Sequence, residues 1–521
     1  MALEEEAGEA MDTSSGSMVR LSAAYEDLSG RYRMSNEAKS YAKQYSHIYA
    51  ARLFMLKSDL MERAKKRWPG ARVVDRIVSA SAATDDSRES DLIAMVGTTF
   101  KEQARPNILD EYRSEILHSE EDQEEEVTVP LYEAGVDDAI ALEDESGRVK
   151  LCGAKVPVAR LVTGVTLAAL GRLTPKGDLE VLELMGPGFL VPKAPPPQQQ
   201  TTTKRILLVS GLLGGGGAAN GNGSLMSSQT QKSDAKFALL CDWLSGSVGG
   251  AAQCDIACSV VRCVVAGDVG GDLADAFATS TQAKSNKSFL KASSNVHNAQ
   301  ETPILKDAFA VRDADVAVAR LCALVPVDLV PGESDPTNAS LPQQPIHPLL
   351  TPNASRFSSF VAATNPHECK IGGHLVVGHS GQPVLDVLKH ADYTRTASDK
   401  RTFLDDTDFE TIDRKGDGSN DHFLAALEDT LYYRHLAPTA PDSLPAYPHQ
   451  ETDPFVIEET PPRILFAGGA PHFATSLATT HSKALTRIVA LPSFSTSGIA
   501  VLVDIDTLQV QQLSFKTPAA S

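Results

Sequence analysis

The chain has 521 residues, of which 42% are hydrophobic, so it is long enough for two or three domains with full cores. Its 67 acidic and 48 basic residues give a net charge of -19, which argues against a protein that grips nucleic-acid phosphates by itself. We find no secretory segment near Met1 and no apolar run of bilayer length, so we predict no membrane partner. The seven cysteines lack paired C-x-x-C spacing, which predicts free thiols in the cytosol or nucleus.

The N-terminal part predicts an arm followed by a helix. We assign residues 1–38 to an arm, whose acidic, hydroxyl-rich first 20 residues favour disorder unless the arm packs on a later domain. The segment 39–67 has apolar side chains at helical spacing and stops at Pro69-Gly70, which predicts an amphipathic helix. The apolar side chains are Tyr41, Tyr45, Ile48, Tyr49, Leu53, Leu56 and Leu60.

Short apolar segments separated by turns follow this helix. Such turns include Glu145-Ser146-Gly147, and several short strands at regular spacing are typical of a small β-barrel. The pattern fits a five-stranded oligonucleotide/oligosaccharide-binding (OB) fold, so we predict an OB-fold domain with its leading helix over residues 39–192. The expected strands are residues 127–132, 138–142, 148–153, 160–171 and 179–184.

The low-complexity run Pro195–Thr203 predicts a linker over residues 193–204. Beyond it, strands alternate with helical stretches, which predicts an α/β domain over residues 205–521. Two polar insertions, 214–235 and 391–421, are expected to be surface loops. The expected strands and helices are residues 205–210, 236–246, 260–266, 305–322, 325–330, 374–378, 382–390, 421–434 and 463–467.

Three strands of the α/β domain end in turns that carry acidic or histidine side chains. Because the carboxyl ends of parallel strands meet at one edge of a sheet, we expect these side chains to lie close together. They are Asp268 after strand 260–266, Glu333 and Asp335 after strand 325–330, and His379 after strand 374–378.

The order of these turns resembles that of the calcineurin-type, metal-dependent phosphoesterases. The equivalent turn in those enzymes reads Gly-Asn-His-Asp/Glu, whereas this chain has Gly332-Glu333-Ser334-Asp335. The histidines of the family pattern are also replaced by Leu212, Gly469 and Pro471. Imidazole is one of the groups that make a divalent site tight, so we predict an inactivated site with no metal, no cofactor and no catalytic residue. Asp268, Glu333, Asp335 and His379 would then be its vestiges, with Asp335 accepting hydrogen bonds from the backbone of its own loop.

Longer strings resemble the small (B) subunits of DNA polymerase delta. The resemblance is strongest in Pro331–Pro348, His435–Leu444 and Thr452–Phe455, and it begins in Gln44–Leu53. It implies an OB-fold domain joined to an inactivated calcineurin-like phosphoesterase domain, in a nuclear scaffold subunit for DNA replication and repair. It also implies contact with the cysteine-rich C-terminal domain of the catalytic subunit and with a third, clamp-contacting subunit. Contact with the sliding clamp and DNA would be indirect.

Two other functions remain as alternatives. An active metal-dependent phosphoesterase is disfavoured by the missing histidines. A single-stranded nucleic-acid-binding OB protein is disfavoured by the acidic balance and by the lack of interleaved arginine and aromatic side chains over residues 138–184.

Overall fold

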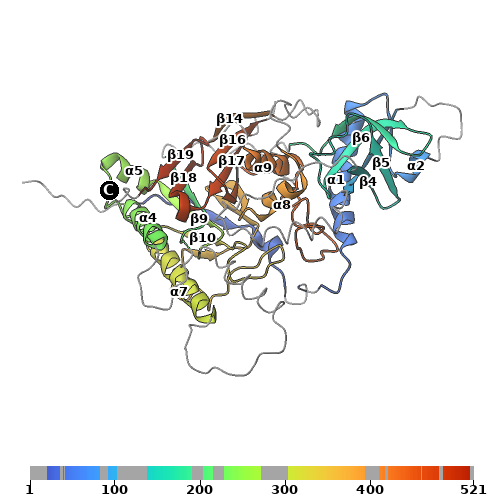
Figure 1. Ribbon diagram of the computed structural model, residues 1–521. Coiled ribbons are helices and arrows are strands. Elements are labelled where there is room, and N and C mark those ends of the chain that lie inside the picture. Colours follow the sequence, from blue (N-terminus) through green and yellow to red (C-terminus); the bar gives the residue numbers. More distant parts are fainter. Residues whose placement is uncertain are drawn as a thin grey trace, which may run out of the picture.

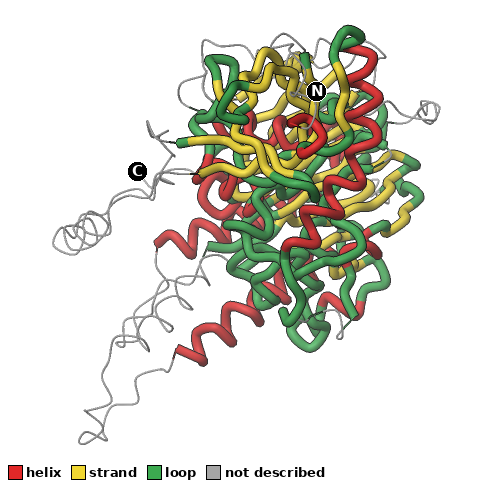
Figure 2. Tube along the Cα trace, turned by 90° about the vertical axis from the view of Figure 1, so that its right-hand side faces the viewer, coloured by secondary structure: helices red, strands yellow, loops and turns green. Residues whose placement is uncertain are grey.

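The strands form three sheets, one in a barrel and two in an α/β unit. Figure 1 shows barrel strands β4, β5 and β6 at one end of the molecule and helices α4 and α7 towards the other. Figure 2 shows the molecule turned by 90°, with strands, helices and loops packed together and some strands at its outside. The computed structural model describes residues 20–35, 39, 41–81, 92–102, 138–189, 203–214, 228–270, 303–393, 410–416, 421–458, 460–479 and 485–516.

The barrel is a six-stranded sheet that closes on itself. Its strand order is β2-β3-β4-β5-β7-β6, and β3 also pairs antiparallel with β6. β3 is buried on both faces, because Ile93 and Met95 belong to one core cluster and Ala94 and Val96 to another. The strands are β2 (Arg72–Val74), β3 (Ile93–Glu102), β4 (Ala139–Glu143), β5 (Arg148–Cys152), β6 (Thr166–Leu173) and β7 (Leu179–Met185).

Helix α1 (Ser46–Arg67) covers one side of the barrel. Its residues Leu53, Leu56 and Leu60 are buried in the same cluster as the outer side chains of β3 and β6, so this helix is held mainly by tertiary packing. A short helix, α2 (Val78–Ser81), follows β2. Among the described residues, no helix combines the length and the apolar character needed to cross a membrane.

The α/β unit contains two sheets that pack face to face. A cluster that includes Leu208, Val264, Phe466 and Val489 fills the space between them. One sheet has, in order, β1 (Tyr25–Asp27), β12 (His367–Ile371), β13 (His374–His379), β15 (Ile464–Ala470), β17 (Leu485–Pro492), β16 (Ala474–Thr479) and β14 (Glu410–Gly416). The other has β11 (Phe360–Ala362), β10 (Val327–Val330), β9 (Val260–Ala266), β8 (Arg205–Val209), β18 (Ile499–Asp504) and β19 (Val510–Ser514).

Helices cover the outer face of each sheet, which gives four layers in the order helix, sheet, sheet, helix. Leu240 and Leu321 of the helices on the six-stranded sheet share a cluster with Leu207 and Val265 of its strands. On that side lie α4 (Ser228–Leu244), α5 (Ala251–Cys258) and α7 (Pro303–Cys322), and on the other side lie α8 (Gln382–His390) and α9 (His422–Tyr432). Shorter turns are η1 (Ser29–Tyr32), η2 (Ala354–Arg356) and α10 (Phe494–Ser497).

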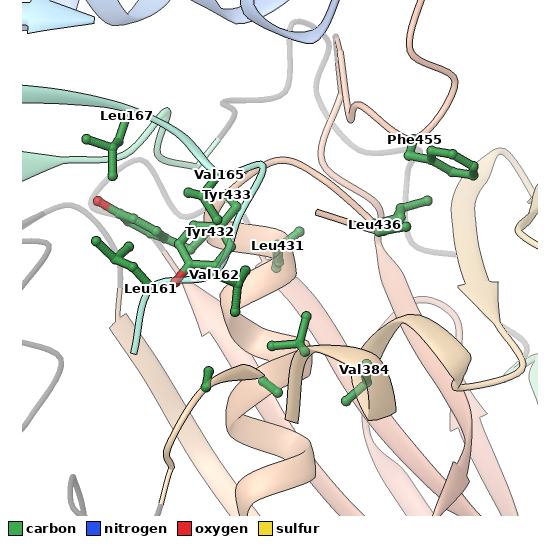
Figure 3. Close-up of a cluster of buried hydrophobic side chains, with 14 of the residues drawn as sticks. Leu161, Val162, Val165, Leu167, Val384, Leu431, Tyr432, Tyr433, Leu436 and Phe455 are labelled. Atoms are coloured by element: carbon green, nitrogen blue, oxygen red, sulfur yellow. The ribbon is translucent and has the colours of Figure 1, made fainter. Parts of the chain in front are cut away.

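The barrel and the α/β unit share one hydrophobic core. Figure 3 shows the barrel side chains Leu161 and Val162 beside Tyr432 and Tyr433 at the end of α9, and all belong to one cluster. The Tyr432 hydroxyl also accepts a hydrogen bond from the amide of Gly186, at 3.3 Å. A continuous buried core of this kind holds two units as one body.

Fully buried polar contacts cross the same junction. The Arg52 guanidinium of α1 donates to the Asp453 carboxylate at 2.7 Å, and both side chains are 0% exposed. Its other nitrogens donate to the carbonyl oxygens of Gly164, Pro438 and Ala440 at 2.7–2.8 Å. Arg52 therefore links the helix, the barrel and two loops of the α/β unit at once.

The described part of the N-terminal arm adds a strand to the α/β unit. β1 pairs antiparallel with β12, with Tyr25 opposite Ile371 and Asp27 opposite Cys369. Before it, the Arg20 guanidinium donates to the carbonyl oxygens of Leu244, Ala257 and Val260.

Several sequence predictions of local structure were wrong in their limits. α1 begins at Ser46 rather than at residue 39, and β6 begins at Thr166, because residues 160–165 form turns. α4 begins inside the predicted insertion 214–235. The predicted insertion 391–421 contains β14, which lacks the alternation of a half-buried strand because its residues from Ile412 to Gly416 are all exposed. The expected strand 127–132 and most of the expected linker lie outside the described residues.

Candidate functional site

The strand ends predicted to form a site meet at one edge of the two packed sheets. β8, β9 and β10 are parallel neighbours, so their carboxyl ends lie side by side, and β13 and β15 are parallel in the facing sheet. The Ser210 hydroxyl after β8 donates to the carbonyl oxygen of Ala266 at 2.8 Å, and the Gly469 amide donates to that hydroxyl at 3.3 Å. These bonds connect the turns of both sheets directly.

Asp335 accepts three backbone hydrogen bonds within this edge. The donors are the amides of Gly332 at 2.8 Å, Asp268 at 2.9 Å and Val269 at 3.0 Å. The predicted role of Asp335 as a backbone acceptor is confirmed, although two of the three donors come from the turn after β9 rather than from its own loop. The carboxylate thus joins the turns that follow β9 and β10.

Asp268 is held by Ser334 of the turn after β10. Its carboxylate accepts from the Ser334 hydroxyl at 2.6 Å and from the Ser334 amide at 3.0 Å. Both bonds go to Oδ1 of Asp268, so Ser334 fixes the orientation of this carboxylate.

Burial and the neighbouring Asp268 carboxylate raise the pKa of the Asp335 carboxyl to about 7, and its three backbone N–H donors oppose this rise. Asp335 and Asp268 lie close enough to repel each other when both are charged. The dipoles of the three N–H groups point their positive ends at Asp335, so they offset part of that repulsion.

His379 lies at the same edge but is closed off from it. The side chain is 0% exposed, its Nδ1 accepts from the Gly381 amide at 3.1 Å, and its Nε2 has no hydrogen-bond partner among the described residues. Burial lowers the pKa of this imidazole to about 3, so it is neutral at physiological pH. The fourth predicted residue, Glu333, is exposed and is not brought together with the others.

Backbone fills the space between the turns. A Cβ atom added at Gly468 would lie 2.4 Å from the Ala266 carbonyl oxygen and 2.7 Å from the Ser210 hydroxyl. One added at Gly332 would lie 2.5 Å from the Asp268 amide nitrogen. Such contacts require glycine, because main chain packs directly against main chain. The turns at this edge therefore pack directly against one another, and a pocket lined by Val269, Asp335 and Pro336 lies beside them.

The sequence analysis missed one cluster of chemically capable side chains, Asp328, His367 and Cys369, which lies between the two sheets. The only signal was the His-x-Cys spacing on β12, a strand that the sequence analysis did not predict. The three side chains come together only when the sheets pack.

Comparisons with known proteins match both parts of the chain. The family of the B subunits of DNA polymerases alpha and epsilon matches residues 225–475, and the family of the OB-fold domain of the DNA polymerase delta subunit matches residues 44–184. The barrel is therefore an OB fold, as predicted.

Curated relatives match along nearly the whole chain. It is 32% identical over 505 residues to the DNA polymerase delta small subunit of Oryza sativa subsp. japonica, which covers 96% of this chain and 99% of the relative. It is 32% identical to DNA polymerase delta subunit 2 of Drosophila melanogaster, with coverages of 96% and 99%. The small subunit of Saccharomyces cerevisiae is 26% identical, with coverages of 93% and 91%.

An OB-fold barrel fused to an α/β unit of this type defines the class of B subunits of DNA polymerases. Within that class, the chain belongs to the DNA polymerase delta small subunit family.

Proposed function

We propose that this chain is a non-catalytic scaffold subunit of the DNA polymerase delta complex and acts in DNA replication and repair in the nucleus. It would connect the cysteine-rich C-terminal domain of the catalytic subunit to a third subunit that contacts the sliding clamp. The observation that carries this proposal is the match to polymerase delta small subunits over 96% of the chain.

The rigidity of the molecule supports a bridging role. A scaffold has to hold two partners in a fixed relation, which a flexible pair of domains does not do. Here the barrel and the α/β unit share a core, and the buried pair of Arg52 and Asp453 crosses their junction. Preorganised surfaces of this kind also bind at lower entropic cost.

The α/β unit is, on this proposal, an inactivated phosphoesterase domain. Two observations support an inert edge over an active phosphoesterase. Ser334 stands where the family pattern has a histidine ligand, and its hydroxyl donates a hydrogen bond to Asp268. Asp335 accepts hydrogen bonds from three backbone amides. The direct packing of Gly332 and Gly468 against neighbouring backbone leaves the turns in contact with one another. An active two-metal site needs open positions on both cations for substrate and water.

Affinity purification from nuclear extract tests the assignment. The full chain with a C-terminal tag should recover the catalytic subunit and the third subunit of polymerase delta, identified by mass spectrometry. The variant Arg52→Met, which removes the buried link between barrel and α/β unit, should recover both partners less well, whereas the exposed control Lys66→Met should recover them as the wild type does. Recovery of neither partner by the wild-type chain would contradict the proposal.

A further inference from the structure

A buried cluster of potential ligands lies between the two sheets, within the strands rather than at their closed edge. Asp328 of β10 and His367 and Cys369 of β12 are each 0% exposed, and one ligand atom from each lies within 4.8 Å of the other two. Asp328 comes from one sheet and the other two from the facing sheet. The strand register places His367 and Cys369 on the same face of β12.

The Asp328 carboxylate and the His367 imidazole are each held in orientation by a hydrogen bond with a further side chain. The Arg262 guanidinium donates to Oδ1 of Asp328 at 2.5 Å, which leaves Oδ2 directed at Nε2 of His367, 3.3 Å away. The Ser29 hydroxyl bonds Nδ1 of the same imidazole at 2.8 Å. Metal-binding carboxylates and histidines are held by outer partners in this way.

Two further groups belong to this region. The Tyr25 hydroxyl of the N-terminal arm is buried and has no hydrogen-bond partner among the described residues, and the buried Cys369 thiol forms no disulfide. Tyr25 lies on the face of the sheet that carries Cys369, and the guanidinium of Arg262 stacks 3.5 Å from the centre of its ring. Unsatisfied buried polar groups are rare in folded proteins, so the Tyr25 hydroxyl calls for an explanation.

We propose that Asp328, His367 and Cys369 bind a structural zinc ion, with the Tyr25 hydroxyl completing the site. Zinc bonds of about 2.0 Å to nitrogen and oxygen and about 2.3 Å to sulfur place tetrahedral ligands about 3.3–3.6 Å apart. The 3.3 Å separation of Oδ2 and Nε2 fits that spacing. Zinc binding would displace the hydrogen between these two atoms and the proton of the thiol, and the aspartate and thiolate would then offset most of the charge of the ion and of Arg262.

The zinc ion would bind the N-terminal arm to the two packed sheets of the α/β unit. Ser29 of the arm contacts His367, and Tyr25 lies on the face of the sheet that carries Cys369, so the zinc would add to the contacts that β1 and Arg20 already make. The cluster lies between the packed sheets, as structural zinc sites lie enclosed by protein, and its four ligands leave no position for a substrate. The inference does not depend on the proposed scaffold function.

Metal analysis of the full chain, purified without a histidine tag, tests the site. After addition of zinc and removal of the excess, elemental analysis should find one zinc ion per chain in the wild type. Cys369→Ser should lose most of it, whereas Cys241→Ser, which alters a buried thiol of α4 outside the cluster, should retain it. Equal zinc in wild type and Cys369→Ser, or none in either, would overturn the proposal.

Cobalt substitution gives a test that requires no variant to fold. The wild-type chain loaded with Co²⁺ should show the thiolate-to-metal charge-transfer absorption of a cysteine ligand and the visible bands of tetrahedral coordination. A chelator should abolish both and lower the melting temperature. A Co²⁺ spectrum without the thiolate band would exclude Cys369 as a ligand and refute the site.

Discussion

At the scale of single residues, the acidic groups at the sheet edge are bonded to protein groups. Asp335 and Asp268 both accept hydrogen bonds from the turns around them. A carboxylate that accepts several N–H groups contributes to stability through those donors, because they would otherwise be buried without partners.

Asp335→Ala should lower the free energy of unfolding by roughly 1–3 kcal/mol, since it leaves three amides unpaired. Chemical denaturation with and without Mg²⁺ or Mn²⁺ measures this. Neither ion should change the free energy of unfolding of the wild type or of Asp335→Ala. Glu333→Ala, an exposed neighbour in the same turn, is the control and should change stability by less than about 0.5 kcal/mol. Stabilisation by either ion in the wild type but not in Asp335→Ala would mean that Asp335 is still a ligand.

The buried imidazole of His379 predicts a pH dependence. Its pKa is about 3 in the folded chain and about 6.5 when unfolded, so below pH 6.5 only the unfolded state takes up the proton. The stability that it contributes is complete above pH 6.5 and is lost as the pH falls towards 3. Between pH 7.5 and 5, the wild type should lose about 2 kcal/mol more than His379→Gln, which has no titrating group.

Denaturation of both proteins at the two pH values measures the difference. Effects of Asp335 and of other buried groups are present in both proteins and cancel. An equal loss in wild type and His379→Gln would show that the imidazole is not held neutral in the folded state.

The same residues predict the absence of phosphoesterase chemistry. With Mn²⁺ added, the purified chain should not hydrolyse bis(4-nitrophenyl) phosphate above the rate of a mock preparation. The reason is that Ser334 hydrogen-bonds the Asp268 carboxylate and that the His379 side chain is fully buried. Absorbance of released nitrophenolate is the measurement. Turnover that disappears in Asp268→Asn would establish an active site at this edge.

At the scale of elements, helix α1 makes an extensive buried polar link between the barrel and the α/β unit, beside their shared core. Arg52 is 0% exposed and makes four hydrogen bonds, one of them to the equally buried Asp453. Removing one partner of a buried ion pair leaves the other charge without compensation.

Arg52→Met should therefore lower the free energy of unfolding by roughly 3–5 kcal/mol, measured by chemical denaturation. Lys66→Met is the matched control, because Lys66 lies on the same helix, is 74% exposed and pairs with the exposed Glu62. It should change stability by less than about 0.5 kcal/mol. Equal effects of the two substitutions would refute the role of Arg52 at the junction.

The sequence predicted best the elements with a regular pattern and clear ends. Helix α8 occupies 382–390 as predicted, and β8, β9 and β10 were found from their apolar runs. β3 was missed because both of its faces are buried, so it shows no alternation. β14 was missed because it is a charged edge strand. β16 to β19 were missed because their sequences show neither clear turn residues nor a clear alternation of apolar and polar side chains.

The positions of the site residues could be predicted further than their contacts. Asp268 and Asp335 meet as expected, because the parallel order of β9 and β10 brings their turns together. Glu333 is exposed to solvent, and the closure of the edge depends on contacts such as that of Gly468 with Ala266, which join different sheets. No local pattern encodes a contact between segments so far apart in the chain.

At the scale of the whole molecule, the proposed adaptor role rests on charge and on the shared core. The chain carries a net charge of -19, which disfavours direct binding to a phosphate backbone, and its two folded units form one body through a shared core. An acidic, rigid molecule of this kind suits protein partners, and the family to which the chain belongs is that of a polymerase subunit.

Reconstitution from purified parts tests the central claim most directly. The catalytic subunit and the third subunit of polymerase delta are mixed with and without this chain, and the molar mass of each species is measured by size-exclusion chromatography with light scattering. We predict a complex with one copy of each of the three chains, and no association of the other two when this chain is left out. A stable complex of the catalytic and third subunits without this chain would contradict its role as the bridge.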